Sequence, residues 1–278
     1  MQTKITKFDG TRQFLMTIIG RAYPRVVGAL RDLNWVFFDT FLPLLTSAGY
    51  VYVYRSLGAP QEYVGFVIFG GAMLAFWMNI LWTMSSQLYW EKETGNLALY
   101  VASPTSMMAI LLGMAIGGLL ATTLRASMIL VIGSWLLDVQ YVVMDPWLLF
   151  AVFLLTMVAL YGMGMMMASL FLLFNREAWH LANLIQAPTM LFSGFYFPVK
   201  VFGFWPAMIS SLIPLTLGLD AMRQLAFPSG ASLGFLSVQA EVGILALLSV
   251  LYVDGSYFVL KYMEGRAVRY GKITDRLS

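Results

Sequence analysis

The chain has 278 residues, of which 60% are hydrophobic and only 11% are charged, and its mean hydropathy is +0.77. A soluble domain carries about 25% charged residues, and no soluble core of this size could cover so much apolar surface. The composition therefore indicates an integral membrane protein without a separate soluble domain. The chain has no cysteine, which excludes disulfides and thiolate metal sites.

The first 34 residues form a basic, partly apolar segment. They carry Arg12, Arg21, Arg25 and Arg31, and their longest apolar stretch is too short for a cleaved signal peptide. Over residues 12–31 this mixture predicts a helix that lies along the inner membrane surface. Residues 1–34 are therefore interpreted as a cytoplasmic N-terminal tail and interfacial helix, with anchoring as its main role.

Six segments beyond residue 34 are apolar and long enough to cross a bilayer, which takes roughly 20 residues of helix. The predicted spans cover residues 35–54, 64–84, 107–137, 147–174, 181–197 and 238–260. The fifth is short and contains Pro188. The predicted fold class is an all-α integral membrane protein, with a six-span transmembrane domain over residues 35–260 and a basic cytoplasmic tail over residues 261–278.

The distribution of basic residues predicts the orientation of these spans. If the N-terminus is cytoplasmic, thirteen of the 17 Lys and Arg residues lie on the cytoplasmic side. The outer side then holds Arg55, Lys200 and Arg223, and Arg125 lies within a span. Basic residues gather in the cytoplasmic loops of membrane proteins. The sequence therefore predicts a multi-pass protein of the cell (plasma) membrane with both termini in the cytoplasm.

Residues 199–219 are apolar, but they are not predicted to form a seventh span. Pro206 and Pro214 lie within this stretch, and Pro198 precedes it. Proline removes a backbone donor, and a lipid-exposed helix must satisfy every backbone group. A seventh span would also place the basic C-terminal tail outside. A hairpin or short re-entrant helices, packed at the outer face between spans five and six, are predicted instead.

The loop between the second and third predicted spans carries a compact polar motif. It reads Glu91-Lys92-Glu93-Thr94-Gly95-Asn96-Leu97 and continues through an apolar run to Ser103-Pro104. Because proline disfavours helix at the residue before it, the segment predicts one short amphipathic helix that ends at Ser103-Pro104. On physical grounds alone, an ordinary inter-span loop explains these residues equally well.

A second motif follows the fifth predicted span. It reads Ser193-Gly194-Phe195-Tyr196-Phe197-Pro198, and Pro214 and Asp220-Ala221-Met222-Arg223 come after it. The two motifs, in this order and on opposite sides of the membrane, resemble those of type-2 ATP-binding-cassette (ABC) transporter permeases. The six-span layout with both ends inside is similar to that family over the whole chain.

The resemblance implies a permease subunit that acts in a homodimer or heterodimer, with each subunit docked on a cytoplasmic ABC ATPase. By this resemblance, coupling to the ATPase would involve Glu91, Lys92, Glu93, Thr94, Gly95, Asn96 and Leu97. Residues 193–198, including Phe195 and Phe197, and residues 214–223 would form the outer gate. Such an exporter would move an amphipathic substrate outward, either a drug, a lipid or a lipid-linked saccharide.

The chain lacks a phosphate-binding loop of its own. The nearest approach runs from Gly265 to Gly271-Lys272-Ile273, with five intervening residues instead of four and Ile where Ser or Thr is needed. The chain is therefore not expected to be an enzyme or to bind a cofactor or a metal. ATP and Mg would bind in the partner subunit. Membrane lipids are the other expected partner, and nucleic acid is not expected.

Four charged residues fall within the predicted spans, where a charge normally faces a cavity or a partner. Arg125 lies well inside the third span, and Glu241 lies at a compatible depth in the sixth, so Glu241 is the predicted partner of Arg125. Asp39 is expected to reach headgroup water, and Asp254 to pair with Lys261. These charges either line the substrate path and gate or orient helices as structural ion pairs.

Two pairs of small residues have the spacing that lets membrane helices approach closely. They are Gly113 with Gly117 in the third span and Gly164 with Ala168 in the fourth. Helix packing is the expected role of both pairs, either within one subunit or between two subunits.

Two other functions compete with an ATP-driven exporter. A gradient-driven secondary transporter would use Asp39, Arg125, Glu241 and Asp254 as a charge relay, although the chain shows no convincing pair of repeated halves. A membrane enzyme is less well supported. One histidine, no cysteine and no His-Glu-x-x-His motif leave few groups for catalysis.

Overall fold

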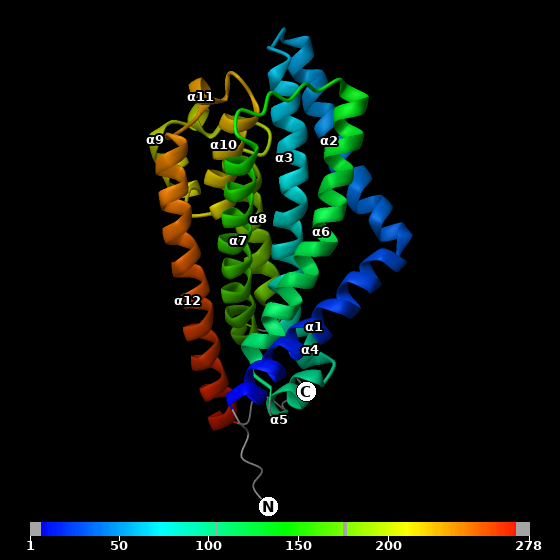
Figure 1. The fold of residues 1–278 in the computed structure, drawn as a ribbon, viewed down its shortest axis with the longest axis vertical. Helices are drawn as coiled ribbons and strands as arrows, with labels where there is room; N and C mark the ends of the chain where they lie inside the picture. Colours follow the sequence, from blue (N-terminus) through cyan, green and yellow to red (C-terminus); the bar gives the residue numbers. More distant parts are fainter. Residues whose placement is uncertain (1–6, 104, 175–176, 271–278) are drawn as a thin grey trace, which may run out of the picture.

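The computed structural model describes residues 7–103, 105–174 and 177–270, and this part of the chain is helical throughout, without a strand. Long helices run along the main axis of a bundle (Figure 1). They are α2 (Leu33–Ser56), α3 (Glu62–Met78), α6 (Met107–Leu137), α7 (Pro146–Phe174) and α12 (Val238–Tyr270). The helix α1 (Lys7–Arg31) begins, and α12 ends, at the same end of the bundle (Figure 1).

Five helices in the described part of the chain are long and apolar enough to cross a membrane. A sixth is possible if the bent pair α9 (Phe204–Ser210) and α10 (Pro214–Ala226) counts as one span. The bounds of α2, α6 and α7 agree with the first, third and fourth predicted spans to within two residues. The second span is formed by α3 together with a π-helix, η1 (Asn79–Met84), which continues it without a break.

The helix at the fifth predicted span ends five residues earlier than the sequence suggests. The helix α8 covers Glu177–Phe192, which is 16 residues, and does not continue to Phe197. Sixteen residues of helix rise about 24 Å, which is less than the roughly 30 Å of a hydrocarbon core. The chain turns just after this helix, where Gly194 adopts a positive φ of 80° that side chains disfavour. The count of six spans therefore stays a prediction.

Short helices cover the end of the bundle that lies opposite the start of α1 (Figure 1). We call it the capped end. These short helices are η2 (Val199–Phe202), α9, α10 and α11 (Gly230–Leu233). Helices α9 and α10 meet at 111°, and Pro214 begins α10, where its missing N–H is tolerated. All 13 residues of α10 are buried, and its neighbours include α7 and α12. The prolines thus break this stretch into short helices, while its placement in a membrane stays a prediction.

The N-terminal helix α1 packs directly against α6 rather than lying apart from the bundle. A Cβ atom added at Gly113 would lie 2.7 Å from the backbone oxygen of Ile18, and one at Gly117 would lie 2.9 Å from that of Ala22. The small-residue spacing in α6 therefore brings two helices of the same subunit together. Gly164 likewise approaches the side chain of Ile80 within the subunit.

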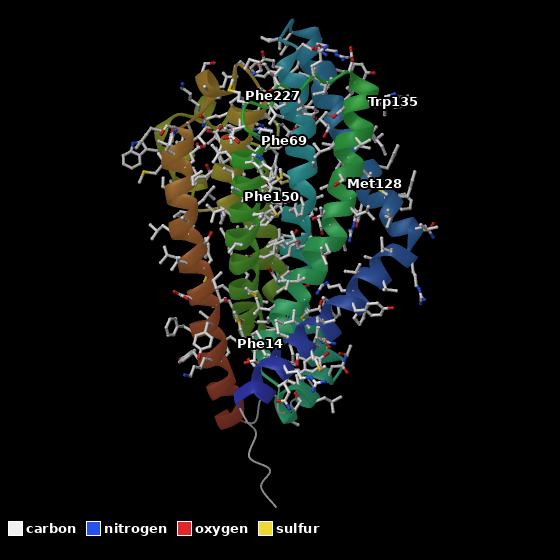
Figure 2. All side chains as sticks on the ribbon, viewed as in Figure 1. Phe14, Phe69, Met128, Trp135, Phe150 and Phe227 are labelled. Atoms are coloured by element: carbon white, nitrogen blue, oxygen red, sulfur yellow. The ribbon has the colours of Figure 1, made fainter. Side chains whose placement is uncertain are left out.

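Large apolar side chains cover the outside of the bundle as well as its interior. Trp77, Phe76 and Leu111 are buried, whereas Trp135 on α6 and Trp147 on α7 are 80% and 84% exposed. Figure 2 shows apolar side chains along the outer faces of the long helices, with Trp135 near one end of α6. Because so much exposed apolar surface is unfavourable in water, the helices fit a multi-pass arrangement in lipid.

The contact between α1 and α6 predicts that Gly113→Ala destabilises the protein. The added methyl group would push against the backbone of α1, so we expect the free energy of unfolding to fall by about 1–3 kcal/mol. Gly243→Ala on α12 is the matched control, because nothing lies within 4 Å of its Cβ position. Thermal unfolding in detergent measures both variants, and equal effects of the two would contradict this packing.

Candidate functional site

The segment expected to couple to an ATPase forms two short helices rather than one. Helix α4 (Gln87–Glu93) and helix α5 (Asn96–Ala102) are joined by a turn at Gly95, whose φ is +82°. Glycine adopts this conformation at little cost, and other residues do not. The prediction of one helix was therefore wrong, because the turn chemistry at Thr94-Gly95 splits it. The two helices lie at the end of the bundle where α1 begins (Figure 1).

The Glu91 carboxylate joins α1, α4 and α5. It accepts hydrogen bonds from the guanidinium of Arg21 at 2.9 Å, the amide of Gln87 at 3.0 Å, the amide of Asn96 at 3.0 Å and the hydroxyl of Tyr100 at 2.8 Å. The guanidinium of Arg21 also lies over the ring of Tyr100, 4.4 Å from its centroid. We call these five residues the Glu91 clasp. They fix the two short helices to α1 and hence to α6.

The chemistry of Tyr100 agrees with a donor role in the clasp. Burial and the hydrogen bond to Glu91 raise the pKa of Tyr100 to about 12. The phenol therefore keeps its proton at physiological pH and donates a hydrogen bond to the carboxylate.

Only part of the predicted coupling motif is available to a partner. Glu91 is 8% exposed and Leu97 is 3% exposed, so both side chains are used inside the subunit. Glu93, Thr94 and Asn96 are exposed, and Lys92 and Gly95 are half-buried. The structure adds two exposed apolar residues that the motif did not include, Trp90 at 54% and Leu99 at 67%.

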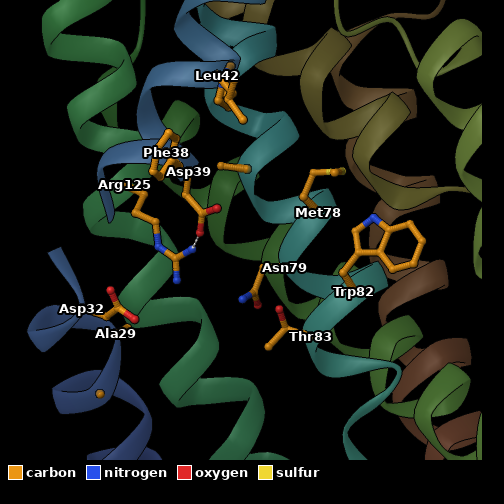
Figure 3. A pocket seen from close by; sticks show the side chains of 13 residues that line it. Ala29, Asp32, Phe38, Asp39, Leu42, Met78, Asn79, Trp82, Thr83 and Arg125 are labelled. Carbon is orange, nitrogen blue, oxygen red and sulfur yellow. Dashed lines mark hydrogen bonds and ion pairs between the residues drawn. The ribbon is translucent and has the colours of Figure 1, made fainter. Parts of the chain in front are cut away.

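Arg125 forms its ion pair with Asp39 on α2, not with Glu241 as predicted. The prediction matched the two residues by depth, but Glu241 is hydrogen-bonded to Gln224 of α10, whereas α2 brings Asp39 to Arg125. The pair lines a cavity of about 630 Å³ between α1, α2, α3, η1 and α6 (Figure 3). Asp39 therefore has a protein partner beside this cavity instead of depending on headgroup water alone.

Glu241 lies in the capped end, in a buried polar cluster. It is 0% exposed, and its carboxyl group accepts hydrogen bonds from the side-chain amide of Gln224 at 3.1 Å and the backbone N–H of Leu236 at 3.4 Å. Asp220, 4% exposed, accepts from the backbone N–H of Phe235 at 2.7 Å and from the same Gln224 amide at 3.4 Å. These bonds tie α10 to the start of α12.

The four intramembrane charges do not form one connected relay. Arg125 and Asp39 lie together, Glu241 lies in the capped end, and Asp254 is exposed on α12. The predicted pair of Asp254 with Lys261 does not form in the described part of the chain. The ammonium of Lys261 lies over the ring of Tyr257 instead, 5.9 Å from its centroid. This separation removes the observation on which a gradient-driven charge relay depended.

Arg223 holds the turn expected to form the outer gate. It is 2% exposed and donates hydrogen bonds to the backbone oxygens of Gly194 at 2.5 Å, Phe195 at 2.8 Å and Phe66 at 2.6 Å. A Cβ atom at Gly70 would lie 1.6 Å from the Phe195 oxygen, so only glycine fits there. Arg223 thus fastens the turn after α8 to α3 through backbone oxygens.

The two predicted gate aromatics have different surroundings. Phe195 is 0% exposed and belongs to the core, whereas Phe197 is half-buried. The ring of Phe197 lies 5.6 Å from that of Tyr50 and 6.1 Å from that of Tyr54, both on α2. Tyr54 also donates a hydrogen bond to the backbone oxygen of Tyr196 at 2.9 Å. The turn is therefore packed against the C-terminal half of α2 as well as α3.

The sequence matches a known family over most of its length. Residues 26–227 match the family model described as ABC-2 type transporter. The match covers well over half of the chain, so the chain belongs to the ABC-2 type transporter family, whose members are membrane-spanning permease subunits. The resemblance found in the two motifs is thereby confirmed.

A curated relative agrees with this assignment. The chain is 24% identical over 168 residues to the probable multidrug ABC transporter permease YbhR of Escherichia coli (strain K12). The aligned residues are 59% of this chain and 44% of the relative, and the protein of the same name from Escherichia coli O157:H7 gives the same values. The match therefore spans less than half the length of these curated relatives.

The Glu91 clasp predicts that Glu91→Gln loosens the segment from α1. An uncharged amide loses the ion pair with Arg21 and presents its own N–H groups to donors. We therefore expect the free energy of local unfolding of this segment to fall by about 2–4 kcal/mol. Hydrogen–deuterium exchange over residues 87–102 should accelerate. The exposed neighbour offers a control, Glu93→Gln, which should leave exchange unchanged. Equal exchange in both variants would show that the clasp does not hold the segment.

The contacts of Arg223 predict that even Arg223→Lys destabilises the capped end. An ammonium lacks the planar guanidinium geometry that reaches three backbone oxygens at once. We therefore expect the free energy of unfolding to fall by about 2–3 kcal/mol. Arg55→Lys is the control, because exposed Arg55 donates to one backbone oxygen, that of Leu137. Thermal unfolding in detergent compares the two. A melting temperature equally lowered by both would contradict the special role of Arg223.

Proposed function

We propose that the chain is the permease subunit of an ATP-driven exporter that moves an amphipathic substrate outward. Two such subunits, identical or different, would form the pathway, and a separate cytoplasmic ABC ATPase would bind ATP and Mg and dock on α4 and α5. The observation that carries the proposal is the Glu91 clasp. It presents a rigid two-helix unit with exposed side chains at one end of a membrane bundle.

The proposed orientation places the α4–α5 end in the cytoplasm of a plasma-membrane protein. The start of α1 and the end of α12 lie at that end, which agrees with an even number of crossings. Six crossings require α8 to span with its 16 residues, helped by the turn that follows it. In this arrangement the short helices α9 and α10 are re-entrant at the outer face, and exposed basic residues of α1 face the inner membrane surface.

Movement of α4 and α5, which we call the docking segment, would reach the membrane helices by two routes. Along the chain, α4 follows η1 and α3 after a turn at Ser85 and Ser86. Through space, the ion pair of Glu91 with Arg21 passes movement to α1, which is packed on the glycines of α6. An ATPase that shifts α4 and α5 would thus act on α1, α3 and α6 together. Opening and closing of the outer turn at residues 193–198 would follow from the movement of α3.

A drug is the substrate best supported among the three amphipathic classes. The Escherichia coli relative is named as a probable multidrug permease. The large exposed apolar surface of the helices suits cargo that enters from lipid. A lipid or a lipid-linked saccharide would use the same physical route.

Affinity purification of the chain from its native cell in mild detergent tests the proposal. We expect a cassette ATPase to co-purify with ATP hydrolysis activity, and Glu93→Lys to reduce its recovery about tenfold, since Glu93 is exposed on the docking unit. Asp254→Lys is the control, because Asp254 is an exposed carboxylate on another helix. If the chain emerges alone without ATPase activity, the proposal fails.

A further inference from the structure

We propose that Asp220 and Glu241 share one proton and form a pH-dependent latch at the capped end. The latch holds residues 234–237, which join α11 to α12 and which we call the linker, against α10. The inference goes beyond the proposed function, because the latch needs neither an ATPase nor a substrate. It rests on the geometry of two buried carboxyl groups and of the donors around them.

The two carboxyl groups meet inside the protein. Glu241 is 0% exposed and Asp220 is 4% exposed, and their side chains are hydrogen-bonded to each other. An ionised carboxylate only accepts hydrogen bonds, so a hydrogen bond between two carboxyl groups requires a proton on one of them. Two ionised carboxylates at this separation would also repel each other strongly in a buried site. The contact itself therefore indicates a shared proton.

The side-chain amide of Gln224 cannot replace this proton. Its nitrogen lies 2.8 Å from the backbone oxygen of Leu236, 3.1 Å from a carboxyl oxygen of Glu241 and 3.4 Å from one of Asp220. An amide nitrogen carries only two hydrogens, and the short bond to Leu236 uses one of them. One hydrogen is left for two carboxyl groups. A proton between the two acids supplies the donor that is missing.

The charges around the pair also favour one bound proton. Arg223 lies one turn along α10 from Asp220, and its charge reaches that carboxyl group. Its guanidinium donates to three backbone oxygens, and in the described part of the chain it forms no ion pair with either acid. One cation and two carboxyl groups are neutral together only when one proton is bound. A buried net charge is costly, so the neutral state is favoured.

No other cation faces the pair from the helices packed around it. Helices α3, α7 and α11 and the linker contain no Lys, Arg or His. The other ionisable groups near this end have partners of their own: Glu62 binds Ser229, Lys200 binds Ser232, Asp145 binds the start of α7, and Tyr252 binds Leu212.

The acids hold the linker through its backbone. The N–H of Phe235 donates to Asp220 at 2.7 Å, and the N–H of Leu236 donates to Glu241 at 3.4 Å. A Cβ atom at Gly234 would lie 2.4 Å from the amide nitrogen of Gln224, so the linker lies directly on this side chain. Gln224 and the linker also line a pocket of about 530 Å³. Displacement of the linker would therefore expose the acids through this pocket.

Opening of the linker and release of the proton are thermodynamically linked. Once water reaches the two acids, both ionise near neutral pH, as solvated carboxyl groups do. The closed state then binds one proton more than the open state, so each rise of one pH unit favours opening about tenfold. The closed linker is most stable at acidic pH and opens more readily as the pH rises. In the proposed orientation the latch responds to the pH outside the cell.

Hydrogen–deuterium exchange of the purified full chain in a maltoside detergent tests the latch between pH 6 and pH 8. The rates are corrected for the intrinsic pH dependence of amide exchange, and residues 87–102 serve as the internal reference. We expect the opening constant of residues 234–241 to rise about tenfold for each pH unit, and that of the reference to stay unchanged. A pH-independent opening of residues 234–241 would overturn the inference.

A neutral variant separates the shared proton from other effects of pH. Glu241→Gln can donate an amide hydrogen to Asp220 but cannot titrate, so we expect the linker to stay protected and its opening to become independent of pH. Asp254→Asn, which removes an exposed carboxylate from the same helix, should keep the tenfold dependence. A pH dependence that persists in Glu241→Gln contradicts the latch. So does an opening that responds to added Ca²⁺ at constant pH, because the acids would then hold a metal cation.

Infrared spectroscopy detects the proton directly in the unmodified chain. A protonated carboxyl group has a carbonyl stretching band that a carboxylate lacks, and a maltoside detergent contributes no carbonyl group. We expect this band at pH 7, with a loss of intensity in Glu241→Gln. Absence of the band in the unmodified chain would overturn the inference. Neither measurement uses an ATPase, so the latch can be confirmed or refuted independently of co-purification.

Discussion

Lipid surrounds a membrane helix with hydrocarbon as apolar as its own side chains, so burial of apolar area does little to hold helices together. Polar contacts and close backbone packing must supply the attraction instead. In this protein three arginines provide the polar part, and each reaches a different region of the chain. Arg21 binds Glu91, Arg125 binds Asp39, and Arg223 binds backbone oxygens. Together they position helices α4 and α5, the cavity and the turn after α8.

Glycine provides the other part of the attraction by removing side-chain bulk where backbones meet. Gly113 and Gly117 let α1 lie against α6, and Gly70 lets the turn after α8 lie against α3. Each contact places an arginine next to its partner, since Arg21 extends from the α1 face that meets Gly113 and Arg223 reaches the oxygen that faces Gly70. Close packing and the hydrogen bonds of an arginine are therefore linked at both ends of the molecule.

The segment from α3 through η1 to α4 connects the turn after α8 with the docking segment. Its buried helix contacts the outer turn at Gly70 and Phe66, its π-helix forms one wall of the cavity, and its end carries the Glu91 clasp. A helix that is packed along most of its length transmits displacement rather than absorbing it. This connection is irregular at the π-helix, which lines the same cavity as the Arg125–Asp39 pair, and at the turn of Ser85 and Ser86.

The sequence by itself determined the helical class, the bounds of α2, α6 and α7, the break of residues 199–219 and the family, because these depend on local apolar length, proline and short motifs. Tertiary structure decided which residues meet. Depth alone suggested Glu241 for Arg125, but the order of helices around the bundle gave it Asp39. The sequence suggested that Glu91 contacts a partner at the surface. In the structure its carboxylate is bound inside the subunit by four hydrogen-bond donors from α1, α4 and α5. Pairing depends on how helices are arranged side by side, and hydropathy along one chain carries no information about that arrangement.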